Sequence, residues 1–541
     1  MYDLLIINGR ILDGTGTPWF WGDVAVQEGR IVEIGLLAGQ AAKQVINADG
    51  RMVSPGFIDM HTHSDLQPLA NPRHESKLRQ GVTTDVIGHD GLGLAPITPK
   101  TAKILQEQLA GWNGRPDLDW NWSTITTYLD RFEETTAINV AMLVPHGTIR
   151  MAVMGMDNRA PSRDEMAQMQ RLVGQCMAEG AIGLSTGLTY APCMFASDDE
   201  MVELCRPLKI YKGFYCPHHR NYGMQAIKGY ADSIEIGRRA GVPVHLTHCH
   251  FGFPINKGRA PELLAMFDQA RAEGVEITLD TYPYGAGSTY LHAFLPMWIH
   301  DGGNAAIIER LKSPEVRQRL RHEMEVTGSD GFHDVPMGWE MIQISGIMDG
   351  EYDSQLIGMY LPDAAEEAGQ SSFDFFCDLL IQTRLSVSCL AHIGNEENVQ
   401  TILQHPAHVV GSDAILIGAR PHPRGWGTHA RFLAHYVRDL GLLSWEEGIR
   451  KMTSATARRI GAMDRGIIRP GFMADLVVFD PDTLRDTATY ENPISYPEGV
   501  HFVVVNGTPT IEEGESTGAT AGRALRQPYN RRPERITELI I

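Results

Sequence analysis

The sequence is short of positive charge and has neither a Cys-x-x-Cys pair nor a long apolar run. Lys and Arg number 47 against 66 Asp and Glu, which gives a formal charge of -19. An acidic chain repels phosphate backbones and anionic lipid, so we expect neither nucleic acid nor a membrane as partner. No apolar stretch approaches the ~20 residues that cross a bilayer, and the first residues lack the basic and apolar segments of a secretion signal.

The seven cysteines are scattered along the chain. Unpaired spacing of this kind is typical of reduced thiols, so we expect a cytoplasmic protein without disulfides. Cys216 and Cys249 stand close to histidines that could bind metal. Because side chains alternate along a strand, Cys249 should face away from His248, and both thiols are expected in the core.

In the middle of the chain, apolar strand-like runs alternate with helical stretches. This alternation is typical of repeated βα units and a parallel sheet. The expected strands are residues 57–63, 83–88, 138–144, 181–185, 213–218, 243–248, 276–282 and 408–413. Eight strands suit a closed (β/α)8 TIM barrel, and 541 residues suit such a barrel with an accessory unit.

Both chain ends have short β-rich runs separated by turns, which predicts one small sheet unit built by the two termini together. The expected domains are residues 1–54 and 461–541 for the two parts of a β-sandwich and 55–460 for the catalytic barrel. Residues 290–346 exceed a normal βα loop and predict an inserted subdomain or lid. We expect residues 514–522 and the Arg/Pro-rich tail to be loosely ordered.

Two helix starts carry a capping box, in which a Ser precedes a Glu by three residues. Ser162 with Glu165 predicts a helix that ends near Gly180, and Ser444 with Glu447 predicts another. A further helix is expected from Ser313, inside the predicted lid. The apolar run at residues 386–391 has no place in this scheme.

Metal-ligand side chains stand at or just past the ends of the expected barrel strands. In a parallel barrel these ends meet at one mouth, so residues distant in sequence come together there. The candidates are His61, His63, Asp90, His218, His248 and Asp413. Four imidazoles and two carboxylates suit one or two zinc-like ions, with Mn or Co as alternatives, and leave positions open for water and substrate.

Several candidates also have a structural interpretation. Asp90 precedes Gly91, and Asp-Gly is a common turn pair. Asp413 could cap a helix after its strand. Arg424 could pair with a structural carboxylate, and His250 could be a packed histidine.

Several ordered motifs resemble the amidohydrolase superfamily and, within it, the D-aminoacylases, over nearly the whole chain. The motifs are residues 55–63 (Pro-Gly-Phe-Ile-Asp-Met-His-Thr-His), 81–84, 183–188, 280–284, 411–413, 422–424 and 474–480. The resemblance implies a metal-dependent hydrolase with a barrel beside a small β-sandwich. It implies that His218 and His248 hold the tighter metal, that His61 and His63 approach a second site, and that Asp413 is the catalytic acid/base.

Two positions depart from the family pattern. Where the resemblance implies a Gly-Asn-Cys-Gly turn with a Cys ligand, this chain has Gly88-His89-Asp90-Gly91. A carboxylate is a harder ligand than a thiolate, so we expect Asp90 to bind metal and two occupied sites to form. Where the pattern has Ser-His-x-Lys, this chain has His250 in place of the lysine, and an unperturbed imidazole is a weaker constant anion anchor.

The expected function is hydrolysis of a linear amide, most simply deacylation of an N-acyl-D-amino acid. Hydrolysis of a dipeptide, cyclic imide or hydantoin-like ring on the same scaffold is the alternative, and a non-catalytic relative is a further one. The residues expected to contact the substrate are Arg424, Tyr282, His250, Ser288 and Tyr190. The expected partner is a small molecule, with a homo-oligomer possible.

Overall fold

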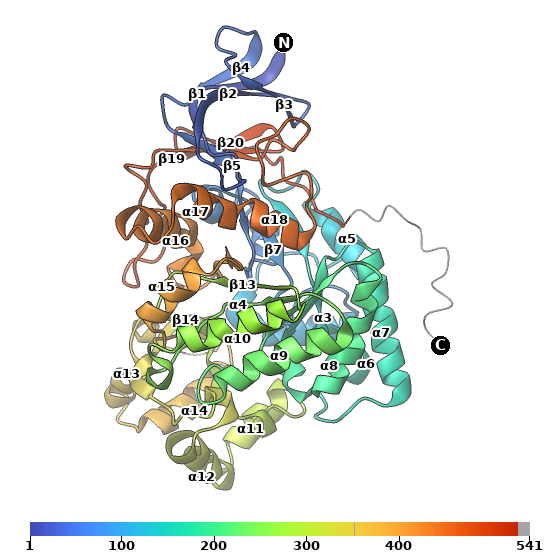
Figure 1. Ribbon diagram of the computed structural model, residues 1–541. Coiled ribbons are helices and arrows are strands. Elements are labelled where there is room, and N and C mark those ends of the chain that lie inside the picture. Colours follow the sequence, from blue (N-terminus) through green and yellow to red (C-terminus); the bar gives the residue numbers. More distant parts are fainter. Residues whose placement is uncertain (351, 528–541) are drawn as a thin grey trace.

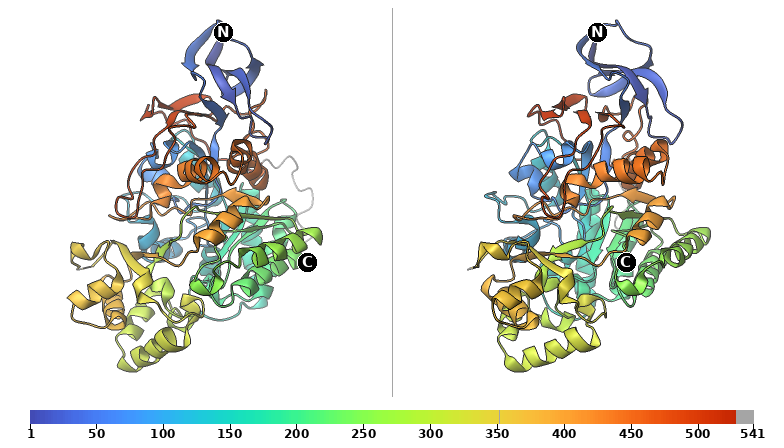
Figure 2. Two further views of the ribbon diagram at one scale, coloured as in Figure 1. Left: turned by 60° about the vertical axis from the view of Figure 1, so that its left-hand side comes forward. Right: turned by 90° about the vertical axis from the view of Figure 1, so that its left-hand side faces the viewer.

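The computed structural model describes residues 1–350 and 352–527. A parallel barrel lies between a sheet made by both ends of the chain and a helical insertion (Figure 1). The sheet and the insertion lie at opposite ends of the molecule in both views of Figure 2. Among the described residues, no helix combines the length and apolar character needed to cross a bilayer.

The barrel contains the strands expected from the sequence, in chain order around the ring. They are β6 (Phe57–Asp59), β7 (Val82–Ile87), β8 (Asn139–Met142) with β9 (Val144–Pro145), β10 (Gly183–Gly187), β11 (Phe214–His218), β12 (Val244–Leu246), β13 (Ile277–Thr281) and β17 (His408–Val410). The amide of Met60 donates to the carbonyl of Val410 at 3.2 Å, and Thr62 forms a parallel bridge with Ala414, so the last strand closes on the first. The (β/α)8 prediction is confirmed.

Helices cover the barrel on its outer side and fill its connections. Those along the barrel are α2 (Glu75–Leu78), α6 (His146–Met154), α7 (Arg163–Ala178), α8 (Asp198–Cys205), α9 (Ala226–Ala240), α10 (Ala260–Ala272), α15 (Glu396–Gln404), α16 (Arg424–Arg431), α17 (Trp445–Met452) and α18 (Ser454–Ile460). The connections hold α1 (Gln67–Ala70), α3 (Pro99–Gln108), α4 (Ala110–Asn113) and α5 (Ile125–Leu129). Ser162 and Glu165 form the expected reciprocal cap of α7, and Ser444 accepts from the amide of Glu447 at the start of α17.

The two chain ends share one nine-stranded sheet, in which β5 (Met52–Pro55) pairs with β18 (Leu476–Phe479). The other strands are β1 (Tyr2–Ile11), β2 (Phe20–Gln27), β3 (Arg30–Gly35), β4 (Ala42–Asn47), β19 (Val500–Val505), β20 (Thr508–Glu512) and β21 (Glu515–Ser516). Alternate residues of β1 pack in different clusters, Leu4 and Ile6 in one and Leu5 in the other. Apolar layers on the two faces give the predicted β-sandwich unit.

Residues 514–522 are not loose, contrary to the sequence prediction. They include β21, and the amide of Gly522 donates to the carbonyl of Thr136 at 2.8 Å. Asn506 Nδ2 holds the carbonyl of Ala521 at 2.7 Å. Tertiary hydrogen bonds therefore order a segment whose composition looks flexible. Residues 528–541 of the Arg/Pro-rich tail lie outside the described residues.

The insertion between β13 and β17 runs past the predicted limits of 290–346. Its three-stranded sheet has the order β14 (Gly287–Tyr290), β16 (Val387–Ala391) and β15 (Ile342–Ile347). The run at 386–391, which had no place in the sequence scheme, is thus the central strand of this sheet. Its helices are α11 (Asn304–Leu311), α12 (Pro314–His322), which begins after Ser313 as expected, α13 (Leu361–Glu367) and α14 (Ser372–Gln382). Residues 287–391 are called the insertion below.

Candidate metal centre

The six side chains expected to bind metal meet at the carboxyl-terminal end of the barrel. His218 is the last residue of β11, and the other five follow a strand by two to four residues. The strands before His61, His248 and Asp413 end earlier than predicted, because the chain turns before the ligand. All six side chains are buried: His61, His63, Asp90, His218, His248 and Asp413.

Three of these residues have a left-handed backbone, with φ of 52° at Asp90, 28° at His248 and 49° at Asp413. Such a conformation costs a non-glycine residue about 1–3 kcal/mol and persists only where the surroundings hold it. The amide of Asp413 donates to the carbonyl of His61 at 2.7 Å, and that of His248 donates to Asp280 Oδ1 at 2.9 Å. The strained backbone therefore lowers the stability of the fold but points these side chains into the cluster.

The ligand atoms form two groups that share Asp90 as a neighbour. In the first, His218 Nδ1 lies 2.8 Å from His248 Nε2 and 3.2 Å from Asp90 Oδ2. In the second, Asp413 Oδ1 lies 3.0 Å from His63 Nε2 and 3.4 Å from His61 Nε2. Asp90 Oδ2 is also 3.5 Å from His63 Nε2. Asp90 thus belongs to the first group and lies next to the second.

The donor set fits a divalent cation. Within residues 1–350 and 352–527, both ring nitrogens of His61 and Asp90 Oδ1 are buried without a hydrogen-bond partner. Leaving such atoms unsatisfied costs about 1–3 kcal/mol each. Imidazole nitrogen and carboxylate oxygen are the ligands that zinc binds in proteins. A cation coordinated here would satisfy His61 Nε2 and Asp90 Oδ1, which the protein leaves unpaired.

The charges of the cluster are strongly coupled. Burial lowers the pKa of His218 to about 4, against the attraction of Asp90. Burial also disfavours charge on His63, but hydrogen bonds to Asp413 and Asp90 outweigh it and raise its pKa to about 10. Burial opposes ionisation of Asp413, yet Arg424 and the imidazoles hold its pKa well below the usual range. Asp413 is therefore a carboxylate at neutral pH.

A second set of side chains orients the imidazoles, as is usual around metal ligands. Thr189 Oγ1 lies 2.7 Å from His218 Nε2, and Tyr222 OH lies 3.0 Å from His248 Nδ1. Asp280 Oδ1, which holds the amide of His248, is 3.5 Å from His61 Nδ1. His218 and His248 are thereby each fixed through the nitrogen that points away from the cluster.

Beneath the cluster, a buried ion pair joins the first and last barrel strands. Lys77 Nζ contacts Asp59 Oδ2 and donates to Ser412 Oγ at 2.7 Å, and all three side chains are buried. Asp59 Oδ1 accepts from the amides of His61 at 3.2 Å and Ser412 at 2.8 Å. One neutralised carboxylate thus holds the backbone next to both His61 and Asp413.

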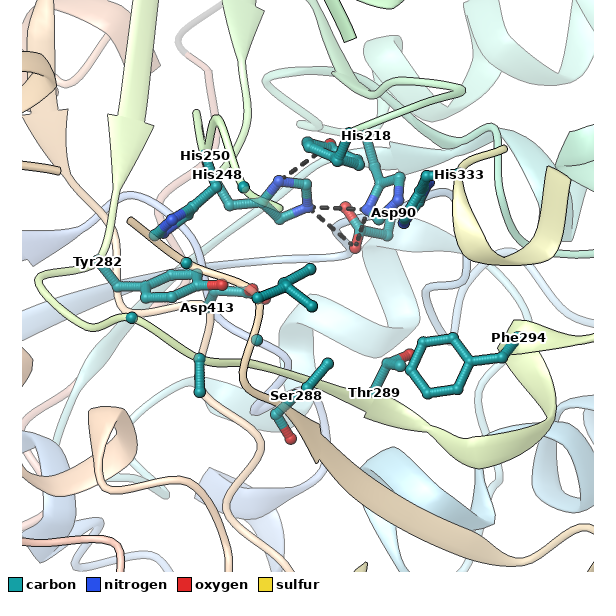
Figure 3. Close-up of a pocket in the computed structure, with 18 of the residues that line it drawn as sticks. Asp90, His218, His248, His250, Tyr282, Ser288, Thr289, Phe294, His333 and Asp413 are labelled. Carbon is teal, nitrogen blue, oxygen red and sulfur yellow. Dashed lines mark hydrogen bonds and ion pairs between the residues drawn. The ribbon is translucent and has the colours of Figure 1, made fainter. Parts of the chain in front are cut away.

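A cavity of about 100 Å³ opens onto the cluster. Tyr190, His250, Tyr282 and Ser288 line it, as expected of substrate-contacting residues. Figure 3 shows Tyr282 and Asp413 on one side and Phe294 and His333 on the other. The cavity therefore has two ends, separated by the imidazole cluster.

Arg424 lies behind this cavity and does not line it. Its Nη1 is 2.9 Å from Asp413 Oδ2, its Nη2 donates to the carbonyl of Ser288 at 3.2 Å, and its guanidinium lies 4.4 Å from the centre of the Tyr282 ring. This geometry matches the interpretation in which Arg424 pairs with a protein carboxylate.

His250 packs its ring on Tyr282 with centroids 4.0 Å apart. Burial, with the nearby charges of His248 and Arg424, lowers its pKa to about 3. A neutral imidazole at this position can form a hydrogen bond but supplies no positive charge. The lysine of the family pattern therefore has no cationic substitute here.

The sequence did not single out several residues of the site. His89 stacks on His61 with centroids 3.9 Å apart, and its place beside Asp90 in one turn was the available signal. Asp280 lies within the expected strand 276–282 and opens the motif at residues 280–284, which was again a signal. The sequence offered no signal for Lys77, because it lies beneath the barrel mouth and not at a strand end. It offered none for His333, because this residue belongs to the insertion.

Comparison with known proteins agrees with this geometry. The family model described as "Amidohydrolase family" matches residues 44–511. The chain is 36% identical to the D-aminoacylase of Alcaligenes xylosoxydans xylosoxydans and 33% identical to its N-acyl-D-glutamate deacylase, covering 97% of this chain in both cases and 97% and 96% of the relatives. It is also similar to the crystal structure of N-acyl-D-glutamate deacylase from Bordetella bronchiseptica complexed with zinc and a phosphonate mimic of the tetrahedral intermediate. The TM-score is 0.82 at 32% identity, over 97% of this chain and 99% of that one.

Proposed function

This chain belongs to the amidohydrolase family, and we propose that it is a metal-dependent deacylase of N-acyl-D-amino acids. The observation that carries the proposal is the buried histidine and aspartate cluster at the barrel mouth, in a chain similar over nearly its whole length to D-amino-acid deacylases. The reaction is hydrolysis of a linear amide that yields a carboxylic acid and a free D-amino acid.

We infer that the metal is zinc. His218, His248 and Asp90 would hold one ion, and His61 with His63 and Asp413 would hold or approach a second. Bound there, a divalent cation lowers the pKa of water towards about 7 and polarises the scissile carbonyl. The lowered pKa of His218 keeps its imidazole neutral, so this ring supplies a lone pair rather than a proton, which suits this role.

Asp413 is the proposed general acid and base. Its carboxylate accepts the proton of the attacking water and returns it to the nitrogen of the departing amine, because an amine leaves only once it is protonated. His63 and Arg424, at 3.0 and 2.9 Å, fix the two carboxylate oxygens. The leaving amine therefore lies on the Asp413 side of the cavity.

The α-carboxylate of the substrate extends from this amine towards Tyr282 and His250. Both are proposed hydrogen-bond donors to it, and the charge of Arg424 acts on it from behind the ring of Tyr282. Tyr190 is held by Thr289, whose Oγ1 is 3.0 Å from its hydroxyl, and Ser288 borders the same cavity. We propose that these two residues position the remainder of the substrate.

The test is an amine-release assay with N-acetyl-D and N-acetyl-L amino acids, a dipeptide and a hydantoin. Hydrolysis of the D series alone is expected, and a preference for the ring or the dipeptide would overturn the proposal. In Asp413→Asn, turnover should fall by about two to four orders of magnitude, the usual effect of losing a positioned acid/base. Wild-type turnover in that variant would refute the role of Asp413.

A further inference from the structure

His333 reaches the catalytic cavity from the insertion. It follows a short helical turn at Asp330–Phe332 and lines the cavity together with Phe294, another residue of the insertion. In Figure 3 its ring lies beside His218, across the cavity from Tyr282. No barrel strand carries it, so its position depends on how the insertion is held.

The backbone at His333 is strained and firmly fixed. Its φ is 61°, and that of Asp334 is 60°, two consecutive left-handed residues of which neither is glycine. Asn221 Nδ2 donates to Asp334 Oδ2 at 2.9 Å, and the amide of Met224 donates to the carbonyl of His333 at 3.1 Å. A Cβ on Gly223 would lie 2.6 Å from that same carbonyl oxygen, so glycine permits the close approach.

The imidazole ring of His333 packs against aromatic side chains, but one of its nitrogens has no hydrogen bond. It contacts Tyr222 and Phe253 edge to face, with centroids 5.4 and 5.7 Å apart. Nδ1 is buried without a hydrogen-bond partner among residues 1–350 and 352–527. Strain of this kind, retained at the edge of an active-site cavity, points to a functional requirement rather than to packing.

The proposed function fixes which part of the substrate lies there. The leaving nitrogen lies at Asp413 and the α-carboxylate extends towards Tyr282, so the acyl group must extend in the other direction from the scissile carbonyl. That direction ends at His333 and Phe294 (Figure 3). The acyl subsite therefore contains one aromatic wall and the imidazole of His333.

We propose that His333 forms a hydrogen bond with the acyl half of the substrate. The favoured acyl groups then carry a hydroxyl or carbonyl group on the carbon next to the scissile carbonyl, rather than a plain alkyl chain. An apolar chain would leave the imidazole nitrogen desolvated and unpaired, whereas a polar group of the same size would satisfy it. This assignment rests on the proposed deacylase function and adds the acyl class to it.

The test compares N-glycolyl-D-leucine with N-propionyl-D-leucine, which differ by a hydroxyl in place of a methyl group. We expect wild-type kcat/KM to favour the glycolyl compound by about five- to tenfold, the effect of one buried hydrogen bond. His333→Phe should bring the ratio close to one. His322→Phe, the same substitution at an exposed site of the insertion, should leave the ratio at its wild-type value.

Because Phe tolerates a left-handed backbone poorly, His333→Asn serves as a second variant. Asn readily adopts this conformation, and its shorter side chain should also reduce the ratio. Equal wild-type rates on the two substrates, or an unchanged ratio in both variants, would overturn the inference while leaving the deacylase function intact. Failure to hydrolyse any N-acyl-D-amino acid would overturn both.

Discussion

Replacing Lys77 with Met tests whether the ion pair under the barrel mouth supports the catalytic cluster. The substitution removes the cation and keeps an unbranched side chain of similar length. Asp59 would then remain as a buried carboxylate without its counter-ion, still bound to the amides of His61 and Ser412. Removing one partner of a buried pair costs about 3–5 kcal/mol, because the other charge remains desolvated.

This loss of stability lowers the melting temperature of the protein. Unfolding entropy of roughly 2 cal/mol/K per residue makes a chain of this length lose about 3–4 °C for that change, measurable by calorimetry. Turnover should fall by about 10- to 100-fold as well, since His61 and Asp413 lose their common support and small misplacements are costly in a preorganised site.

Two further variants separate the causes. Lys451 is also buried, but its Nζ donates at 2.6 Å to the carbonyl of His405 and at 3.3 Å to that of His408, so Lys451→Met should cost only about 1–2 kcal/mol and spare turnover. Adding Asp59→Asn to Lys77→Met removes the stranded charge and should restore most of the lost stability. Equal melting temperatures for Lys77→Met and wild type would refute the argument.

Three other outcomes follow from the structure. His218→Ala or His248→Ala should remove bound metal, as measured by elemental analysis, whereas His405→Ala, far from the cluster, should retain it; full occupancy in both ligand variants would contradict the ligand set. Burial of His292 lowers its pKa to about 3. The folded state therefore does not bind the proton that the unfolded state binds below about pH 6.5. Stability should therefore fall by about 2 kcal/mol between pH 6.5 and 5 on account of this group, and urea titrations of His292→Gln should show a smaller loss. Gly522→Ala would place a Cβ 2.1 Å from the carbonyl oxygen of Ile138, so limited proteolysis should release the segment near residue 522 faster than in wild type.

The sequence was sufficient for the barrel because local signals and the fold agree there. Apolar runs of strand length recur between helical stretches, and the two Ser-x-x-Glu caps mark real helix starts. The metal-ligand candidates could be found because they stand at strand ends, where a barrel brings distant residues together. Their roles as ligands, and that of Asp413 as acid/base, remain predictions for the variants above.

Other features depend on tertiary structure and leave no local pattern. His248 and Asp413 have a left-handed backbone within residues predicted as strand, where the sequence pattern favours an extended backbone. The insertion joins β14 to β16 across about a hundred residues, a pairing that periodicity cannot reveal. The neutral state of His250 follows from burial, and an isolated imidazole would have been half charged near pH 6.5.

The pairing of β5 with β18 has a consequence for how the chain is made. The strands of the first half of this sheet, up to β5 (Met52–Pro55), are synthesised first. The strand that pairs with β5, β18 (Leu476–Phe479), is synthesised more than four hundred residues later. Protein synthesis adds about 5–20 residues per second, so the early strands remain for roughly 20–80 s with unpaired backbone N–H and C=O groups at their edge. During that interval the nascent amino-terminal segment is the part of the molecule most exposed to mispairing, and chaperone capture would act there first.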